Sequence, residues 1–263
     1  MVEAGRAVPR SLSPPCPPLR RASGRTTIGR RRPIAGRPRE SPMHTPAPPN
    51  AHPPVERLVA THAGAVTTLL CEAFFDYPVM RYVLGDAPDY AGRLVRLIGL
   101  FTAGRWLRGH PVLGLRGADG ALQAAITMTP RGAFPVPAAL AELAEATWST
   151  LGADAKQRYA TLCEAWSATE PAGEHWHVNM LGVATAAHGA GHGGRLLAAA
   201  LDLAAEDPAA QAVDLTTEDA ANLGFYTRRG FELAGHCRVG TALETWTLVA
   251  PRHAGGGFGK LRP

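Results

Sequence analysis

The sequence contains few cysteines and no long apolar run. Its four cysteines (Cys16, Cys71, Cys163 and Cys237) have neither the spacing of a metal site nor that of a disulfide framework, which is typical of a reducing compartment. No apolar stretch is long enough to cross a bilayer, and none resembles the apolar core of a signal peptide. We therefore expect a cytoplasmic chain with no membrane partner.

Acidic residues are scarce in the first 54 residues. This segment contains ten Arg but only Glu3 and Glu40, so its charge is +8 against +5 for all 263 residues, which leaves −3 for the remainder. The positive charge therefore does not belong to the part that folds. This argues against nucleic acid as a partner of the folded part.

Residues 1–54 also have few large apolar side chains and are rich in Arg, Pro, Ser and Gly. We expect a disordered tail, because such a segment cannot offset its loss of chain entropy. Three interpretations stay open: a polyanion-binding arm around Arg30–Arg32, a transit peptide, or a true translation start at Met43. Residues 55–250 are expected to form one domain, followed by a flexible tail over residues 251–263.

The spacing of apolar residues predicts a mixed α/β or α+β domain. A first helix, which ends before Pro78, carries its apolar residues at helical spacing: Val66, Leu69, Leu70, Ala73 and Phe74. The pattern also predicts helices around 94–101, 138–149, 153–167, 191–206 and 220–229. Strands are expected at 55–60, 112–116, 122–129, 175–183, 212–217, 231–239 and 243–249.

A glycine-rich turn joins the expected strand at 175–183 to the expected helix at 191–206. It follows the strand end Leu181-Gly182-Val183 and reads His188-Gly189-Ala190-Gly191-His192-Gly193-Gly194. A turn without bulky side chains lets the backbone approach a ligand, and the N–H groups at a helix start bind phosphate. The turn therefore predicts a site for a diphosphate.

The same glycines also match the dinucleotide-binding fingerprint, with Asp214 twenty residues beyond Gly194. Two features oppose a Rossmann fold. Residues 184–188 separate the strand from the glycines, and too little chain follows residue 175 for the remaining strands.

A second motif lies about thirty residues further on and reads Asn222-Leu223-Gly224-Phe225-Tyr226-Thr227-Arg228-Arg229-Gly230-Phe231. Taken alone, it is a short helix capped by Gly230, with Tyr226 as a half-buried aromatic residue. Together, the two motifs closely resemble the GNAT superfamily of acyl-CoA-dependent N-acetyltransferases. The resemblance implies a mixed, mostly antiparallel central sheet flanked by helices, with a CoA cleft where the central strands splay apart.

The resemblance also implies acetyl-CoA as co-substrate and assigns residues to it. Tyr226 is implied as the general acid that protonates the leaving thiolate, and a backbone N–H near Val183 as the group that polarises the thioester carbonyl. The implied CoA-binding residues are Leu181, Gly182 and Val183 for pantetheine, His188, Gly189, Ala190, Gly191, His192, Gly193 and Gly194 for the diphosphate, and Asn222 for the CoA arm.

A narrower likeness concerns puromycin N-acetyltransferase and its relatives. The chain resembles them in Ala73-Phe74-Phe75-Asp76-Tyr77-Pro78-x-x-Arg81, in Thr129-Pro130, in Trp176 and in Thr245-Trp246. Those enzymes use N-terminal helices to build an amine pocket opposite the CoA cleft. The likeness implies a small-molecule amine as acceptor.

Two positions depart from the family pattern. His188 stands where Gln or Arg is usual, which reduces the side-chain contribution to diphosphate binding but leaves the backbone amides. Thr216 stands where relatives often carry a glutamate, and Glu218 lies two residues later in an expected loop. His188 and His192 have no visible third ligand, so we expect no metal.

The sequence leaves the general base open. Strict alternation along 175–183 places His177, Asn179 and Leu181 on one face and Trp176, Val178 and Met180 on the other. His177 is the candidate base, because an unperturbed imidazole has a suitable pKa for deprotonating an ammonium, directly or through water. A packed strand histidine fits the sequence equally well.

Three functions follow. The favoured one is transfer of an acetyl group to the primary amine of a small molecule by direct attack, without a covalent acyl-enzyme, because neither motif contains a cysteine. The second is acetylation of a protein N-terminus or lysine, which needs an open groove. The third is a non-catalytic acyl-CoA sensor. The sequence indicates no oligomeric state.

Overall fold

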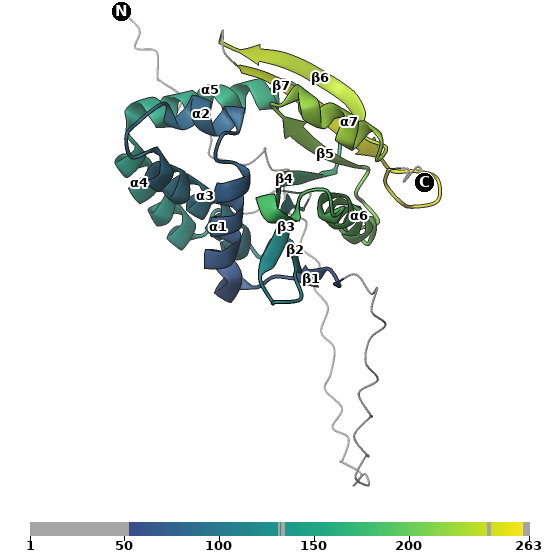
Figure 1. Ribbon diagram of the computed structural model, residues 1–263. Coiled ribbons are helices and arrows are strands. Elements are labelled where there is room, and N and C mark those ends of the chain that lie inside the picture. Colours follow the sequence, from purple (N-terminus) through teal and green to yellow (C-terminus); the bar gives the residue numbers. More distant parts are fainter. Residues whose placement is uncertain (1–52, 131, 133–134, 241–242, 260–263) are drawn as a thin grey trace, which may run out of the picture.

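The computed structural model describes residues 53–130, 132, 135–240 and 243–259, so the expected disordered tail lies almost wholly outside the described residues. The described part forms a seven-stranded sheet with helices on both faces (Figure 1). The strand order is β1-β2-β3-β4-β5-β7-β6, and among the described strands only β4 and β5 pair in parallel. The expected mixed, mostly antiparallel sheet is confirmed, and a Rossmann sheet is excluded.

Most elements have nearly the bounds that the pattern predicts. The strands are β1 Glu56–Arg57, β2 Val112–Arg116, β3 Leu122–Thr129, β4 His175–Val183, β5 Ala212–Thr217, β6 Glu232–Val239 and β7 Leu243–Pro251. The α-helices are α1 Ala63–Ala73, α2 Pro78–Leu84, α3 Tyr90–Leu107, α4 Ala138–Leu151, α5 Ala153–Ser167, α6 His192–Ala205 and α7 Leu223–Thr227. The 3₁₀ turns are η1 Ala60–His62, η2 Thr185–Ala187 and η3 Ala220–Asn222.

Helix α2 is absent from the sequence prediction. Pro78 reads as the stop of the preceding helix, but it is also the first residue of α2, where its missing N–H is not needed for an intrahelical bond. Tyr77 before it is extended, with φ −67° and ψ 134°, and turns the chain between α1 and α2.

The sheet has one apolar layer on each face. Helices α1 to α5 cover one face, and their core includes Val66, Leu70, Leu94, Leu97 and Ile98. Helix α6 covers the other face, where the core includes Leu196, Leu197, Ala200, Val213 and Phe231. Within the described part of the chain, no helix is both long and apolar enough to span a bilayer.

A bulge at Asn179 changes the faces of β4. Val178 pairs with Met128 of β3 and Met180 pairs with Thr127, so Asn179 is an extra residue without a partner. An extra residue reverses the side-chain alternation beyond it. Met180 therefore packs in the layer of α1 to α5, whereas Leu181 packs with Trp176 and Val178 in the layer of α6. The predicted faces, with Leu181 beside His177 and Met180 beside Trp176, are wrong for this reason.

The two central strands separate after four paired positions. His175–Val178 of β4 pair with Ala212–Leu215 of β5. Beyond this point β5 continues along β7, and β4 continues along β3 up to Val183. The sheet thus diverges into a β1–β4 half and a β5–β7 half, as Figure 1 shows. This is the splayed arrangement that the family resemblance implies.

The segment after β7 folds back onto the core. Arg252 and Phe258 form an isolated β-bridge, and the Arg252 guanidinium lies 4.6 Å from the centroid of the Phe258 ring. Phe258 is buried in the core on the α6 side. Arg252 also donates to the carbonyl oxygens of Ala210 and Gly256, each at 2.6 Å. The expectation of a flexible tail is therefore wrong for residues 251–258, while 260–263 lie outside the described residues.

Candidate active site

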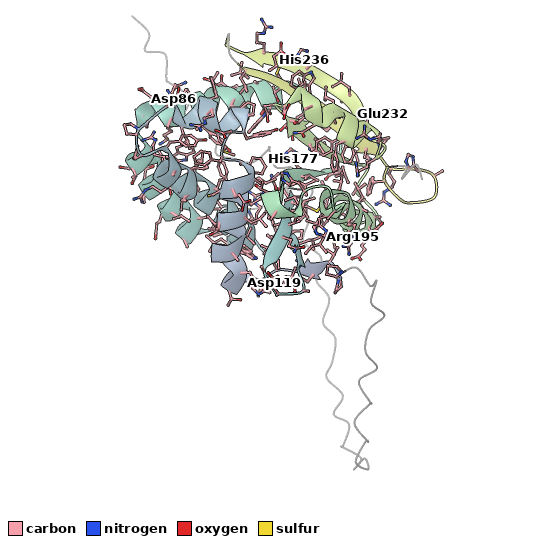
Figure 2. The ribbon with its side chains drawn as sticks, viewed as in Figure 1. Asp86, Asp119, His177, Arg195, Glu232 and His236 are labelled. Carbon is pink, nitrogen blue, oxygen red and sulfur yellow. The ribbon has the colours of Figure 1, made fainter. Side chains whose placement is uncertain are left out.

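A cavity of about 810 Å³ lies where β4 and β5 separate. Figure 2 shows His177 near the middle of the molecule, between helices α1 to α5 and strands β5 to β7. One side of the cavity is lined by residues predicted to bind CoA: Leu181, Gly182, Val183, His188, Gly189, Gly191, His192, Gly193, Gly194 and Asn222. The opposite side, which we call the helical side, is lined by Phe74 and residues of α2, α3 and α5.

The glycine turn has the backbone that its sequence predicts. Gly189 and Gly191 have positive φ values of 81° and 77°, a backbone conformation that favours glycine. The backbone conformation and not a lack of space favours glycine there, because a Cβ atom at either position would meet no atom within 4 Å. The first hydrogen bond of α6 runs from Arg195 N–H to Gly191 O at 3.1 Å. The N–H groups that precede it at the helix start are therefore free to bind an anion.

Three residues of the turn behave differently from the glycines. The Nε2 atom of His188 lies 3.1 Å from Val183 O, so its ring braces the end of β4. Ala190 is the predicted CoA residue that does not line the cavity, and its N–H bonds to Ala187 O at 3.4 Å. His192 is buried, and its Nδ1 atom has no hydrogen-bond partner among the described residues.

Tyr226 lines the cavity from α7, beside the predicted CoA residue Asn222. Its ring makes edge contacts with Phe225 and Phe231, at centroid distances of 5.0 and 5.9 Å. Burial raises the pKa of Tyr226 to about 12, and the nearby charge of Glu218 contributes to the rise. Tyr226 is therefore protonated near neutral pH and can act as a proton donor.

His177 lines the cavity and is paired with a carboxylate behind it. Parallel register places His177 opposite Asp214 of β5, and Nδ1 lies 2.8 Å from Asp214 Oδ2. Burial lowers the pKa of His177, but the charge and hydrogen bond of the buried Asp214 outweigh this effect, so the pKa is raised overall. A proton on Nδ1 donated to Asp214 leaves Nε2 as the acceptor nitrogen of the neutral ring.

Glu218 is a buried carboxylate in the same cavity. It accepts hydrogen bonds from Thr245 Oγ1 at 2.6 Å and from Trp166 Nε1 at 3.0 Å. Burial raises its pKa despite these bonds. Tyr77 from the α1–α2 connection accepts the Glu218 backbone N–H at 3.0 Å, and its hydroxyl also lies 3.0 Å from Thr217 Oγ1.

The sequence places Glu218 in a loop after β5, where it does lie, but does not indicate that its side chain enters the cavity. Its partners Trp166 and Thr245 come from α5 and β7. No pattern within the chain links these distant residues. The only signal is the distance of two residues from Thr216, the position where relatives often carry a glutamate.

The helical side is mostly aromatic and aliphatic, and it carries one guanidinium. Phe101 of α3 and Tyr159 of α5 are in ring contact at 5.4 Å, and Tyr159 meets Trp166 at 6.3 Å. Arg105 of α3 lies beside them and donates to Asn179 Oδ1 at 3.0 Å. This side can therefore hold an apolar group close to a positive charge.

The three cysteines in the described ranges lie away from this cavity. Cys71, Cys163 and Cys237 are free, and none is a lining residue. Burial raises the pKa of Cys71 and Cys163 to about 11, so both are thiols near neutral pH. Across the ranges that the structure covers, no three His, Cys, Asp or Glu residues are grouped to hold a metal ion.

Comparison with known proteins agrees with this architecture. Residues 140–231 match the model of the acetyltransferase (GNAT) family, a range that contains β4, the glycine turn and Tyr226. No curated protein sequence matches the chain.

Solved structures share the fold at low sequence identity. A histone acetyltransferase HPA2 and related acetyltransferase from Corynebacterium glutamicum is 16% identical, with a TM-score of 0.56 over 75% of this chain and 96% of that chain. The polyamine N-acetyltransferase of Drosophila melanogaster, which forms N-acetylagmatine, is also 16% identical, with a TM-score of 0.51 over 75% of this chain and 98% of that chain.

The narrower likeness to puromycin N-acetyltransferases stays a prediction. The broader likeness to GNAT acetyltransferases rests on the matched segment, and the sheet, the splayed strands and the glycine turn agree with it. Residues 140–231 of this chain therefore match the acetyltransferase (GNAT) family.

Proposed function

We propose that this chain transfers an acetyl group from acetyl-CoA to the primary amine of a small molecule. The observation that carries the proposal is the cavity, which joins the glycine turn to the apolar helical side without a break. A thioester bound at the turn and an amine bound at the helical side would meet within it. Holding both in one cavity makes the reaction effectively unimolecular.

The shape of the helical side favours a small acceptor over a protein. Helices α2, α3 and α5 wall it with large side chains such as Met80, Phe101 and Trp166. A protein N-terminus or lysine would require a groove that admits the flanking chain. These walls therefore support a small molecule as the acceptor.

Acetyl-CoA would be held by residues already placed at the cavity. The N–H groups at the start of α6 suit its diphosphate, and Leu181 to Val183 of β4 suit its pantetheine arm. Bound in this way, acetyl-CoA supplies the acyl group and the thiolate leaving group. Oxyanion charge on the thioester carbonyl would be stabilised by a β4 backbone N–H near Val183.

Proton transfers are assigned to His177 and Tyr226. The acceptor ammonium gives a proton to Nε2 of His177, and Asp214 holds the ring in the tautomer that leaves Nε2 open. The free amine attacks the carbonyl carbon, so a C–N bond forms and the C–S bond breaks. Tyr226 gives its proton to the departing sulfur, and the surplus proton on the new amide nitrogen passes to the tyrosinate, which restores the Tyr226 hydroxyl. The carboxylate of Glu218 attracts the ammonium to this region before reaction.

Free-thiol release from acetyl-CoA by the purified protein tests the proposal. The panel contains puromycin, an aminoglycoside, spermidine, amino acids with their decarboxylated amines, and a short peptide. Release with a small amine supports the proposal. Release only with the peptide would make a protein the acceptor. Calorimetric binding of acetyl-CoA with no release by any amine would favour the sensor function.

A further inference from the structure

Arg105 brings an uncompensated positive charge to the helical side of the cavity. It lies in the last turn of α3, one turn after Phe101, and both line the cavity. Its Nη1 donates to the uncharged side chains of Thr129 and Asn179. Its Nε and Nη2 atoms make no hydrogen bond to any residue in the described part of the chain.

No carboxylate in the described ranges forms an ion pair with this guanidinium. The two acidic residues that line the cavity have other partners: Glu218 bonds to Thr245 and Trp166, and Asp219 accepts the Ala221 N–H. Asp214, which lies behind the lining, bonds to His177. Burial, together with the positive charge of Arg108, lowers the pKa of Arg105 to about 10. A desolvated cation without a counter-ion is costly, so an anion delivered by a ligand is strongly favoured there.

We propose that the acceptor amine also carries a carboxylate and that Arg105 binds this carboxylate. The inference rests on the proposed function and names its substrate class, an amino acid with an apolar side chain. The free Nε and Nη2 atoms form one edge of the guanidinium, which matches the two oxygens of a carboxylate.

The charges of the cavity orient such a substrate. His177 interacts electrostatically with both Arg105 and Glu218, so a cationic and an anionic group both lie near it in the cavity. The carboxylate of the acceptor meets Arg105, while its ammonium meets Glu218 and His177. Its apolar side chain packs against Met80, Leu97 and Phe101. A polyamine would instead bring a second positive charge towards Arg105, which disfavours it.

The test compares amino acids with the amines that lack only the carboxylate. The pairs are leucine and isopentylamine, methionine and 3-(methylthio)propylamine, and phenylalanine and phenethylamine. Thiol release gives kcat/KM for each compound with the wild type and with Arg105→Met. Because free amines differ in basicity, the decisive quantity is the change in the ratio within a pair. We expect the ratio to fall at least about tenfold in Arg105→Met, mainly through KM, as for loss of a charged hydrogen-bonded pair.

Two further variants separate binding from folding. Arg105→Lys keeps the charge but not the planar edge, and should recover part of the preference. Arg108→Met removes the same charge from the end of the same helix but lies outside the cavity lining, so its ratios should equal those of the wild type. Equal ratios in wild type and Arg105→Met, with both proteins folded by circular dichroism, overturn the inference.

A binding measurement keeps this inference distinct from the proposed function. Calorimetry follows 4-methylpentanoate and 3-phenylpropionate, the carboxylates without the amine, as they bind to the CoA-loaded protein. Binding that Arg105→Met weakens at least about tenfold supports a carboxylate site, whether or not any amine is acetylated. If no amine is acetylated, that result contradicts the proposed function alone. Acetylation of the plain amines, without an effect of Arg105→Met, would leave the function standing and overturn the carboxylate site.

Discussion

Tyr226 and His177 line the same cavity, and the proposed mechanism needs Tyr226 protonated and His177 neutral. In the proposed mechanism Tyr226 carries a proton to the sulfur, and burial keeps that proton in place by raising the pKa of Tyr226 to about 12. His177 must lose its proton before it can accept another, yet Asp214 raises its pKa. The pair therefore works best above the pH at which His177 becomes neutral and below that at which Tyr226 ionises.

Replacing Tyr226 by Phe removes the proposed acid while keeping the ring contacts with Phe225 and Phe231. We expect turnover to fall by about 10²–10⁴-fold, the usual contribution of general acid–base catalysis, with little change in acetyl-CoA affinity. Thiol release and calorimetry measure the two quantities. Tyr82→Phe, in α2 and outside the cavity lining, is the matched control. Unchanged turnover in Tyr226→Phe would remove this residue from the mechanism.

The pH profile reports on His177. Its pKa lies above the ordinary 6.5, so kcat/KM should rise with pH through a midpoint above that value. On the alkaline side we expect a first fall near pH 10, where Arg105 loses the charge proposed to bind the acceptor, and a second fall near the Tyr226 pKa of about 12. In Asp214→Asn the charge that raises the His177 pKa is gone, so the midpoint should move to lower pH. A midpoint that follows the acceptor amine and ignores Asp214→Asn would argue against His177 as the base.

The residues that the sequence locates well belong to continuous motifs. The glycine turn and Tyr226 are fixed by local chain geometry, so their neighbours in sequence are also their neighbours in space. Glu218 and Arg105 are different. Trp166 and Thr245 hold the carboxylate of Glu218, and Asn179 meets Arg105 from the bulge of β4. Contacts between such distant residues leave no periodic signal.

At the level of elements, periodicity predicts the helices and strands but not their irregularities. The bulge at Asn179 and the start of α2 at Pro78 are single-residue events set by packing against other elements. Both matter for the site. The bulge turns Met180 towards the helices, and the extended Tyr77 before α2 reaches Thr217 and Glu218.

The contact of β4 with α1 depends on Gly182. A Cβ atom there would lie 2.8 Å from Leu70 Cδ2 and 3.0 Å from Ala73 Cβ, so α1 would have to move. We expect Gly182→Ala to lower the free energy of unfolding by about 1–3 kcal/mol, as overpacked cores do. Urea unfolding measures the change.

Gly99→Ala in α3 is the control for Gly182→Ala, because a Cβ atom at residue 99 would meet nothing within 4 Å. It should raise the free energy of unfolding by about 0.5–1 kcal/mol, since alanine loses less chain entropy in a helix. Equal stabilities of Gly182→Ala and the wild type would contradict the close approach of β4 and α1.

For the molecule as a whole, the sequence pattern indicates the class of fold, while the strand order comes from non-local pairing. The family resemblance supplies the splayed sheet, since no local pattern shows that β7 lies between β5 and β6. The composition of the segment after β7, which contains Pro and Gly, is typical of a flexible terminus. Contacts of Arg252 and Phe258 hold it in place instead. Two residues alone do not form a periodic pattern that could be detected in the sequence.

The returning segment should contribute to global stability. Phe258 is only 7% exposed and packs in the core on the α6 side. Phe258→Ala should therefore lower the free energy of unfolding by about 3–5 kcal/mol. Leu233→Ala, at a side chain 57% exposed on β6, is the control and should change it by less than about 0.5 kcal/mol. Equal effects in thermal or urea unfolding would mean that the segment does not share the core.

The separation of β4 from β5 leaves part of a strand edge unpaired inside the molecule. From Met180 to Val183, β4 bonds to β3 on one side and to no described strand on the other. Unpaired strand edges are templates for self-association. The ligand-free protein is therefore the form most at risk during heating or concentration, and a co-substrate lying along this edge would act as its solubilising partner. Storage with CoA should keep the chain monodisperse for longer than storage without it.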